Sequence, residues 1–249
     1  MLQNWPIPLV IAHRGASAHA PENTIASFQL AKLHHADAIE FDVKLSADRQ
    51  VVVIHDSTVD RTTNGSGKVS DLSLAEIKEL DSGSKFDRQF SGEKIPSLRD
   101  VFEFIGDQLI VNIELTNYKS PMDGLVYEIK KLINEFGLRD NILFSSFYPS
   151  NLKLAQKLMP DIPCGLLTFP RILGKISMKL SNPRSYQALH PNIADVSEQL
   201  VSKVHSQGKR IHVWTVNKET EMDKMLKLGV DGIFTDDPQK LRSLLEISG

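Results

Sequence analysis

Six ionisable residues lie within or directly after short apolar runs of this chain. Histidine suits proton transfer near neutral pH, because its side chain titrates there. Clustered carboxylates suit a hard divalent cation, and an arginine beside them suits a phosphate. Together these types indicate metal-assisted cleavage of a phosphate ester, and the residues are His13, Arg14, Glu40, Asp42, His55 and Glu114.

The carboxylates occupy one face of two expected strands. In the segment 38–45 apolar and charged residues alternate, which places Glu40 and Asp42 on the same side. Glu114 alternates with apolar neighbours in the segment 109–115. Unpaired inward carboxylates would cost several kcal/mol, and a bound cation removes that cost. For strand 38–45 alone, an antiparallel sheet with a solvated face or a buried ion pair remains an equal alternative. Oxygen-only ligands favour Mg²⁺ or Ca²⁺ over zinc, and the sequence does not decide between the two.

Both histidines are expected at equivalent strand ends. His13 follows the apolar run 9–12, and His55 follows the apolar run 51–54. Active sites of parallel α/β barrels lie at the carboxyl ends of the strands. We interpret Asp56 as the opening of a turn rather than as a partner of His55. Arg14, adjacent to His13, is interpreted as a phosphate ligand rather than as part of a surface ion pair.

Short apolar runs alternate with amphipathic stretches along the whole chain, which predicts parallel strands joined by crossover helices. The expected strands are 8–13, 38–45, 109–115, 141–145, 163–168, 186–190, 210–215 and 231–235. The expected helices are 23–35, 98–106, 122–136, 149–159, 197–207, 218–228 and 237–247.

This rhythm predicts an α/β fold, a (β/α)8 TIM barrel, because about eight such units fit a chain of about 250 residues. An open doubly wound sheet is the alternative, and no dinucleotide glycine fingerprint supports it. Residues 57–97 are rich in Gly, Ser, Asp and Lys and are interpreted as a small insertion after the second strand region. Without a linker or low-complexity tract, residues 1–249 are expected to form one domain.

Composition excludes several classes of protein. The net charge of −2 gives no electrostatic case for nucleic acid. Cys164 is the single cysteine, so an intrachain disulfide framework and a cysteine zinc site are excluded. Residues 1–8 lack the pattern of a signal peptide, and no apolar run is long enough to span a bilayer. A cytoplasmic protein is therefore expected.

The chain resembles the glycerophosphodiester phosphodiesterase family. The resemblance rests on seven stretches in order, which are 13–24, 40–43, 55–56, 113–115, 189–191, 213–217 and 232–238. It implies a (β/α)8 barrel that hydrolyses glycerophosphodiesters to sn-glycerol 3-phosphate and an alcohol.

By position, the resemblance implies a role for each site residue. Glu40, Asp42 and Glu114 resemble the metal ligands of the family, and His13 and His55 resemble its general acid and base in an unassigned order. Arg14 resembles its phosphate ligand, and Trp214 resembles an aromatic wall of the substrate pocket, with a core aromatic as the alternative. The nucleophile that the resemblance suggests is the neighbouring glycerol hydroxyl, and direct attack by water is the alternative.

One position departs from the family pattern. The family often has a lysine two residues after the third metal ligand, where this chain has Thr116. Phosphate binding is then left to Arg14 and the metal, or to a lysine from elsewhere. Lys119 is near in sequence, but nothing in the sequence assigns it to the site.

The segment 162–194 contains basic residues but no Asp or Glu. It is interpreted as an ordinary outer helix whose apolar stripe faces the barrel, with contact to an anionic membrane as the alternative. The main alternatives for function are a lysophospholipase D acting on membrane lysophospholipids and a non-catalytic phosphate-binding barrel. A metal-dependent sugar-phosphate aldolase or isomerase fits two histidines less well. The oligomeric state is left open.

Overall fold

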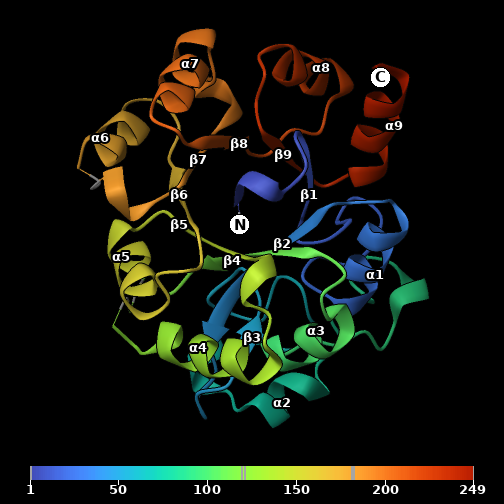
Figure 1. Cartoon of the computed structure of the whole chain (residues 1–249). Helices are drawn as coiled ribbons and strands as arrows, with labels where there is room; N and C mark the ends of the chain where they lie inside the picture. Colours follow the sequence, from blue (N-terminus) through green and yellow to red (C-terminus); the bar gives the residue numbers. More distant parts are fainter. Residues whose placement is uncertain (1, 119, 121, 181–182, 249) are drawn as a thin grey trace.

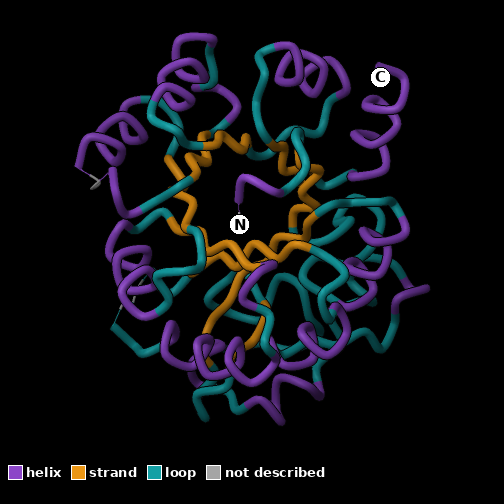
Figure 2. The backbone as a smooth tube through the Cα atoms, in the orientation of Figure 1, coloured by secondary structure: helices purple, strands orange, loops and turns teal. Residues whose placement is uncertain are grey.

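The computed structural model describes residues 2–118, 120, 122–180 and 183–248. Within these residues, eight parallel strands form a closed ring, which confirms the predicted (β/α)8 barrel (Figures 1 and 2). Each strand pairs with its neighbours along the chain, and β1 closes the ring by pairing with both β2 and β9. The barrel strands are β1 (Leu9–His13), β2 (Ala38–Leu45), β4 (Ile110–Leu115), β5 (Ile142–Ser146), β6 (Cys164–Thr168), β7 (Ala188–Pro191), β8 (Arg210–Val213) and β9 (Gly232–Thr235).

Helices surround the strands as an outer layer (Figure 2). They are α1 (Ile25–Leu33), α3 (Leu98–Ile105), α4 (Leu125–Phe136), α5 (Pro149–Leu158), α6 (Ile172–Leu180), α7 (Glu198–Ser206), α8 (Glu219–Lys227) and α9 (Pro238–Ser248). Hydroxyl side chains cap several of them: the Oγ1 of Thr24 accepts the amide of Ser27 at α1, and the Oγ of Ser97 accepts the amide of Asp100 at α3. In the described ranges, no helix is both long and apolar enough to cross a bilayer.

The alternation in β2 sorts its side chains between two environments. Ile39, Phe41 and Val43 are buried in the main core between strands and helices, where Phe41 packs on Phe28 at 5.5 Å between ring centroids. The alternate residues therefore point into the barrel, as predicted. The amino-terminal turn lies over the centre of the ring (Figure 1), and Trp5 joins the cluster of buried residues inside it.

The segment after β2 carries a strand that the barrel does not include. β3 (Val51–Val53) pairs antiparallel with β2, Val43 opposite Val53. The expectation that His55 ends a strand equivalent to that of His13 is therefore wrong. The returning strand instead brings the chain back along β2, where the amide of Ile54 donates to the carbonyl of Asp42 (2.9 Å). This return sets His55 at the level of the β2 carboxylates.

Beyond β3, the segment 57–97 holds α2 (Leu74–Glu79) and a small apolar cluster of its own, consisting of Val52, Ile54, Val59, Val69, Ile77 and Ile95. Short 3-10 turns complete the described elements; they are η1 (Leu2–Asn4), η2 (Val69–Asp71), η3 (Arg88–Phe90), η4 (Arg139–Asn141), η5 (Pro183–Ser185) and η6 (Ile193–Asp195).

Helix α6 does not bury the stripe that was expected to face the barrel. Ile172, Leu173 and Ile176 are exposed, while Gly174 is buried and Met178 is half-buried. Gly174 lies against the preceding turn so closely that a Cβ there would approach the carbonyl oxygen of Phe169 to 2.2 Å. The glycine thus sets which face of α6 packs inward, and the predicted orientation is wrong for the three larger residues. The side chains of Lys175 and Lys179 lie outside the described part of the structure.

Candidate active site

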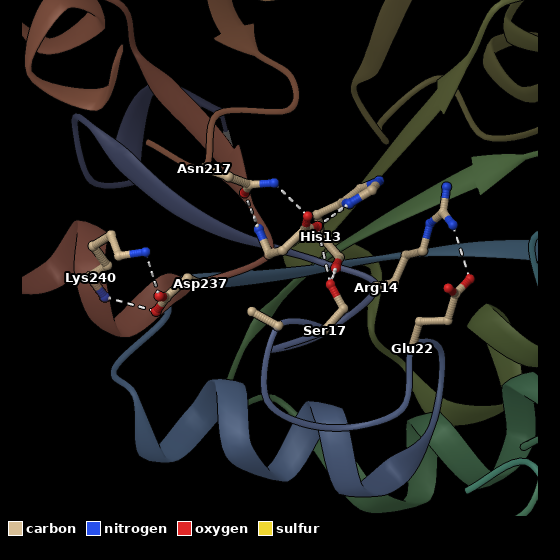
Figure 3. Close-up of a pocket in the computed structure, with 9 residues that line it drawn as sticks. His13, Arg14, Ser17, Glu22, Asn217, Asp237 and Lys240 are labelled. Carbon is tan, nitrogen blue, oxygen red and sulfur yellow. Dashed lines mark hydrogen bonds and ion pairs between the residues drawn. The ribbon is translucent and has the colours of Figure 1, made fainter. Parts of the chain in front are cut away.

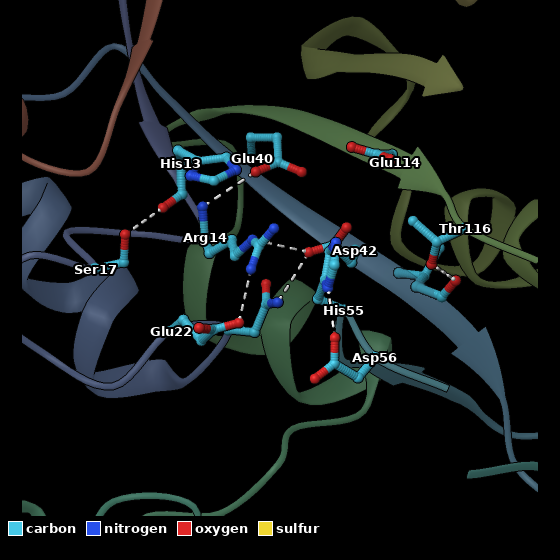
Figure 4. Close-up of polar contacts among 12 residues, drawn as sticks. His13, Arg14, Ser17, Glu22, Glu40, Asp42, His55, Asp56, Glu114 and Thr116 are labelled. Carbon is cyan, nitrogen blue, oxygen red and sulfur yellow. Dashed lines mark hydrogen bonds and ion pairs between the residues drawn. The ribbon is translucent and has the colours of Figure 1, made fainter. Parts of the chain in front are cut away.

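Three carboxylates meet inside the carboxyl end of the barrel (Figure 4). Glu40 and Asp42 come from β2, and Glu114 stands directly opposite Asp42 in the β2–β4 register. One oxygen from each residue lies within 4.8 Å of the others. The structure therefore brings together the three residues that were predicted as metal ligands.

The three carboxylates repel one another in a buried position. Burial, followed by repulsion from Asp42, raises the pKa of Glu40 well above its usual range. The same two effects raise the pKa of Glu114 to about 8, against a hydrogen bond from Tyr118. The Oε1 atom of Glu40 is buried and has no hydrogen-bond partner among the described residues. An oxygen-only set with an unsatisfied carboxylate oxygen fits Mg²⁺ or Ca²⁺.

Arg14 is held in the turn that follows β1. Its φ of 58° and the φ of 85° at Gly15 give a sharp left-handed turn. A Cβ on Gly15 would lie 2.3 Å from Oγ of Ser27, so only glycine lets this turn pack on α1. The Arg14 amide donates to Glu40 (3.1 Å), which ties the turn to the carboxylate cluster.

The guanidinium of Arg14 lies among carboxylates at the edge of the site (Figure 4). Its Nη1 donates to Glu22 (2.9 Å), and its Nε lies 3.4 Å from Oδ2 of Asp42. Asn23 donates to the same Asp42 oxygen (3.0 Å). Arg14 is thus fixed beside the predicted metal ligands by ion pairs with Glu22 and Asp42, and its role as a phosphate ligand stays a prediction.

His13 is held by a carboxylate from the far end of the chain. Its Nδ1 lies 2.6 Å from Oδ1 of Asp236, which follows β9. Asp236 also accepts from Asn217 (2.5 Å) and Ser17 (3.1 Å). Although burial alone would raise the pKa of Asp236, the hydrogen bond from His13 and these donors hold it below its usual value. A proton on Nδ1 leaves the Nε2 atom of His13 for chemistry.

His55 is held by its own neighbour. Its Nδ1 lies 2.8 Å from Oδ1 of Asp56, so the interpretation of Asp56 as a turn residue alone is wrong. Arg61 donates to the second oxygen of Asp56 (2.5 Å) and, through Nη1, to Glu22 (2.7 Å). Against the effect of burial, Arg61 and His55 together lower the pKa of Asp56. Because Glu22 also binds Arg14, one chain of ion pairs links the surroundings of both predicted catalytic groups.

Trp214 forms part of the wall of the site. It lines a cavity of about 200 Å³ together with both histidines and the carboxylates Glu40 and Glu114. Its Nε1 donates to the carbonyl of His190 (2.8 Å), and its ring meets Phe147 edge-on at 5.5 Å. Trp214 is half-buried, and it also packs against the buried cluster inside the barrel, so it lies between the cavity and the core.

A second cavity, of about 310 Å³, is also lined by His13 and Arg14 (Figure 3). Its wall includes Asn217, Asp236 and Lys240. His13 and Arg14 thus line both cavities.

A lysine contacts Thr116, the position where the family often has a lysine of its own. Nζ of Lys44, on β2, donates to Oγ1 (2.9 Å) and to the carbonyl (2.8 Å) of Thr116. Lys119, the nearby candidate in sequence, lies outside the described residues. The cation next to position 116 therefore comes from the neighbouring strand.

Sequence reasoning missed several polar residues that support the site, among them Lys44, Arg61, Tyr118 and Asp236. Tyr118 donates to Oε1 of Glu114 (2.5 Å). Asp236 lies in a stretch that carried the family resemblance, 232–238, but no role followed for it from sequence alone. Lys44 lies two residues after Asp42 on the charged face of β2, and that position was the available signal for it.

A parallel barrel with a carboxylate cluster, an arginine and two carboxylate-held histidines at its carboxyl end belongs to a recognisable class of barrel enzymes. The model of the "Glycerophosphoryl diester phosphodiesterase family" matches residues 13–240. The chain belongs to this family.

Individual relatives agree with this assignment. A glycerophosphodiester phosphodiesterase of Caldanaerobacter subterraneus is 43% identical and covers 97% of this chain and 99% of its own length. A glycerophosphodiester phosphodiesterase of Bacillus altitudinis is 37% identical, and the match covers 95% of this chain and 98% of the relative. A phosphodiesterase of Oleispira antarctica, solved with the product sn-glycerol-3-phosphate, superposes with a TM-score of 0.87 at 32% identity, with 96% and 97% covered.

Proposed function

We propose that this chain hydrolyses glycerophosphodiesters to sn-glycerol 3-phosphate and an alcohol, with a divalent cation and two histidines. The observation that carries the proposal is the carboxylate cluster, whose ligand atoms lie within 4.8 Å of one another beside His13 and His55. The product found in the Oleispira antarctica relative supports the choice of substrate.

Glu40, Asp42 and Glu114 would hold the cation. When bound, it supplies positive charge that stabilises the charge developing on the phosphate oxygens. Arg14 binds the same phosphate through its guanidinium, which the surrounding carboxylates hold in place. Lys44, fixed at Thr116, adds a further positive charge next to Glu114.

The two histidines carry the protons. Each has its Nδ1 bound to an aspartate, which fixes the tautomer with Nε2 towards the cavity. One histidine removes the proton from the attacking hydroxyl, and the other protonates the leaving alkoxide. The attacking group is the neighbouring glycerol hydroxyl, as the family resemblance suggests. Its attack releases the alcohol and gives a cyclic phosphate, which water then opens to sn-glycerol 3-phosphate. Direct attack by water on the diester is the alternative. A transient cyclic glycerophosphate seen by phosphorus NMR would separate the two routes.

The proposal is tested by release of glycerol 3-phosphate from glycerophosphocholine and glycerophosphoethanolamine. We expect activity that a chelator abolishes and that either Mg²⁺ or Ca²⁺ restores, which also ranks the cations. Glu114→Gln should lose cation binding in calorimetry together with activity. Glu135→Gln is the matched control, because Glu135 is exposed and pairs with Arg99 at the surface. Full activity in the presence of chelator would contradict the metal requirement.

A further inference from the structure

A group of large apolar side chains is exposed at the start of α6. Phe169, Ile172, Leu173 and Ile176 form what we call the α6 surface; they are 43%, 69%, 59% and 47% exposed. Four such residues within eight positions leave a contiguous apolar face in water. Contiguous apolar faces of this kind mark sites of interaction with a partner or a membrane.

The α6 surface lies at the same end of the barrel as the active site. Phe169 directly follows the carboxyl end of β6, and Ile172 and Leu173 form the first turn of α6. The carboxyl ends of the strands carry the carboxylates and the histidines described above. In Figure 1, α6 lies at the rim of the ring, outside β6.

Aromatic rings connect the α6 surface to the cavity. Phe169 stacks on Phe147 with 4.4 Å between centroids, and Phe147 meets Trp214 at 5.5 Å. Phe147 and Trp214 both line the cavity that contains the catalytic candidates. An apolar path therefore runs from the site to the exposed face of α6.

The sequence that contains the α6 surface is basic. Residues 162–194 include no Asp or Glu, but they include Arg171, Lys175, Lys179 and Arg184. Asp195, just beyond this segment, accepts the backbone amide of Arg171 (2.7 Å). Exposed apolar residues within a basic segment match the interface of an anionic bilayer, which offers apolar depth below a layer of negative headgroups. A second copy of the chain is a less suitable partner. In a two-fold dimer through the same face, the basic segments of the two copies would face and repel each other.

We infer that the α6 surface docks on an anionic phospholipid bilayer and sets the mouth of the active site against the lipid. Resting on the proposed function, this docking gives the site access to glycerophosphodiesters that carry an acyl chain, namely lysophospholipids. The acyl chain would leave the site along Trp214, Phe147 and Phe169, while the phosphate occupies the cluster.

The docking is tested by sedimentation of the full chain with vesicles. Vesicles of phosphatidylcholine with phosphatidylglycerol should carry the protein down at low salt, whereas phosphatidylcholine alone should not. The double variant Ile172→Gln/Leu173→Gln should weaken this partitioning by about ten-fold, because the inserted apolar area is lost. The matched control is Leu33→Gln/Ile247→Gln, which alters residues that are 65% and 83% exposed on other helices and should bind like the wild type.

Soluble glycerophosphocholine separates the two proposals. Both double variants should hydrolyse it at the wild-type rate, while the α6 variant alone should lose rate on vesicle-borne lysophosphatidylcholine. Absence of sedimentation with anionic vesicles at low salt overturns the docking, whatever the hydrolysis shows. Equal binding by the α6 variant and the control overturns it as well. A concentration-dependent dimer that the α6 variant abolishes would assign the surface to a second copy and also overturn it. Vesicle binding without any hydrolysis would leave the docking standing and contradict the proposed function.

Discussion

The two catalytic candidates are held in the same way by carboxylates in different electrostatic surroundings. His13 and His55 each place Nδ1 on an aspartate oxygen, at 2.6 Å and 2.8 Å. Asp236, which holds His13, has the neutral side chains of Ser17 and Asn217 as its other partners. Asp56, which holds His55, is in an ion pair with Arg61.

The two aspartates therefore differ in how much of their negative charge is neutralised by a neighbouring side chain. Among the described residues, no lysine or arginine is paired with Asp236, whereas Arg61 compensates much of the charge of Asp56. Both aspartates fix the tautomer of a ring, but Asp236 also adds charge. Removing charge at Asp236 should therefore affect catalysis more than the same change at Asp56.

The largest effect is expected when either ring is removed. His13→Ala and His55→Ala should each lower kcat by about 10²- to 10⁴-fold, because a general acid or base contributes on that order. Steady-state hydrolysis of glycerophosphocholine measures the effect, and calorimetry should show cation binding retained. His19→Ala is the control, because His19 is partly exposed and pairs with Asp237 away from the carboxylate cluster. Wild-type kcat in either site variant would remove that histidine from the proposed mechanism.

Substitution of the aspartates tests the comparison itself. Asp236→Asn should lower kcat by at least about 10-fold, with the roughly 10⁴-fold effect of the same change in a serine-protease triad as the upper bound. Asp56→Asn should cost less, because Arg61 already offsets the charge that the change removes. The ratio of the two kcat values is the measurement, with KM determined for both. An equal loss in the two variants would show that the aspartates act through ring orientation alone.

The fold could be predicted closely because each barrel strand is a short buried segment, apolar or alternating, between helical patterns. β2 has the predicted bounds, and the other barrel strands differ from prediction by no more than two residues at either end. β3 was not predicted as a separate antiparallel strand, because the run 51–54 looks the same in a parallel or an antiparallel setting. The inward face of α6 was mispredicted because the glycine contact that orients it depends on the preceding turn.

The site could be predicted where its chemistry is local in sequence. Strand alternation alone places Glu40 beside Asp42, and the histidines follow apolar runs. The pairing of His13 with Asp236 joins residues 223 positions apart, and it exists because β1 and β9 close the ring. Likewise, Lys44 reaches Thr116 only because β2 and β4 are neighbours across the inserted segment. Contacts of this kind depend on which strands are neighbours in the barrel, and the local pattern of a single sequence does not reveal individual side-chain pairs between such strands.

A smaller effect is expected at the cation that compensates Asp56. Arg61→Gln releases Asp56 and Glu22 from the ion-pair chain and should change kcat by less than about 10-fold. Because Arg61 is about half exposed, the loss of stability should stay within about 1 kcal/mol. The sharper readout is the double variant Arg61→Gln/Asp56→Asn. If Arg61 is the reason for the weak effect of Asp56→Asn, this change should lower kcat more in the Arg61→Gln background than in the wild type. Additive effects of the two changes would contradict the compensation.

The smallest effect on catalysis is expected at a third arrangement of histidines, the buried pair His190 and His212. Their rings meet inside the barrel, with Nε2 of His190 3.2 Å from Nδ1 of His212. The other nitrogen of each ring is buried and has no hydrogen-bond partner within the described part of the chain. Burial lowers the pKa of His212 from 6.5 to about 4, and burial with the neighbouring ring lowers that of His190 as well.

The pair should thus limit stability in acid rather than activity. Below pH 6.5 the two histidines are protonated in the unfolded chain, whereas in the folded protein they stay neutral. The free energy of unfolding should therefore fall as the pH drops from about 6.5 towards 4. The slope approaches about 1.4 kcal/mol per pH unit for each such histidine. Urea unfolding at a series of pH values measures it, and His212→Asn should flatten the slope while His19→Asn leaves it unchanged. An unaltered slope in His212→Asn would mean that the acid sensitivity does not come from the buried pair, and it would contradict this prediction.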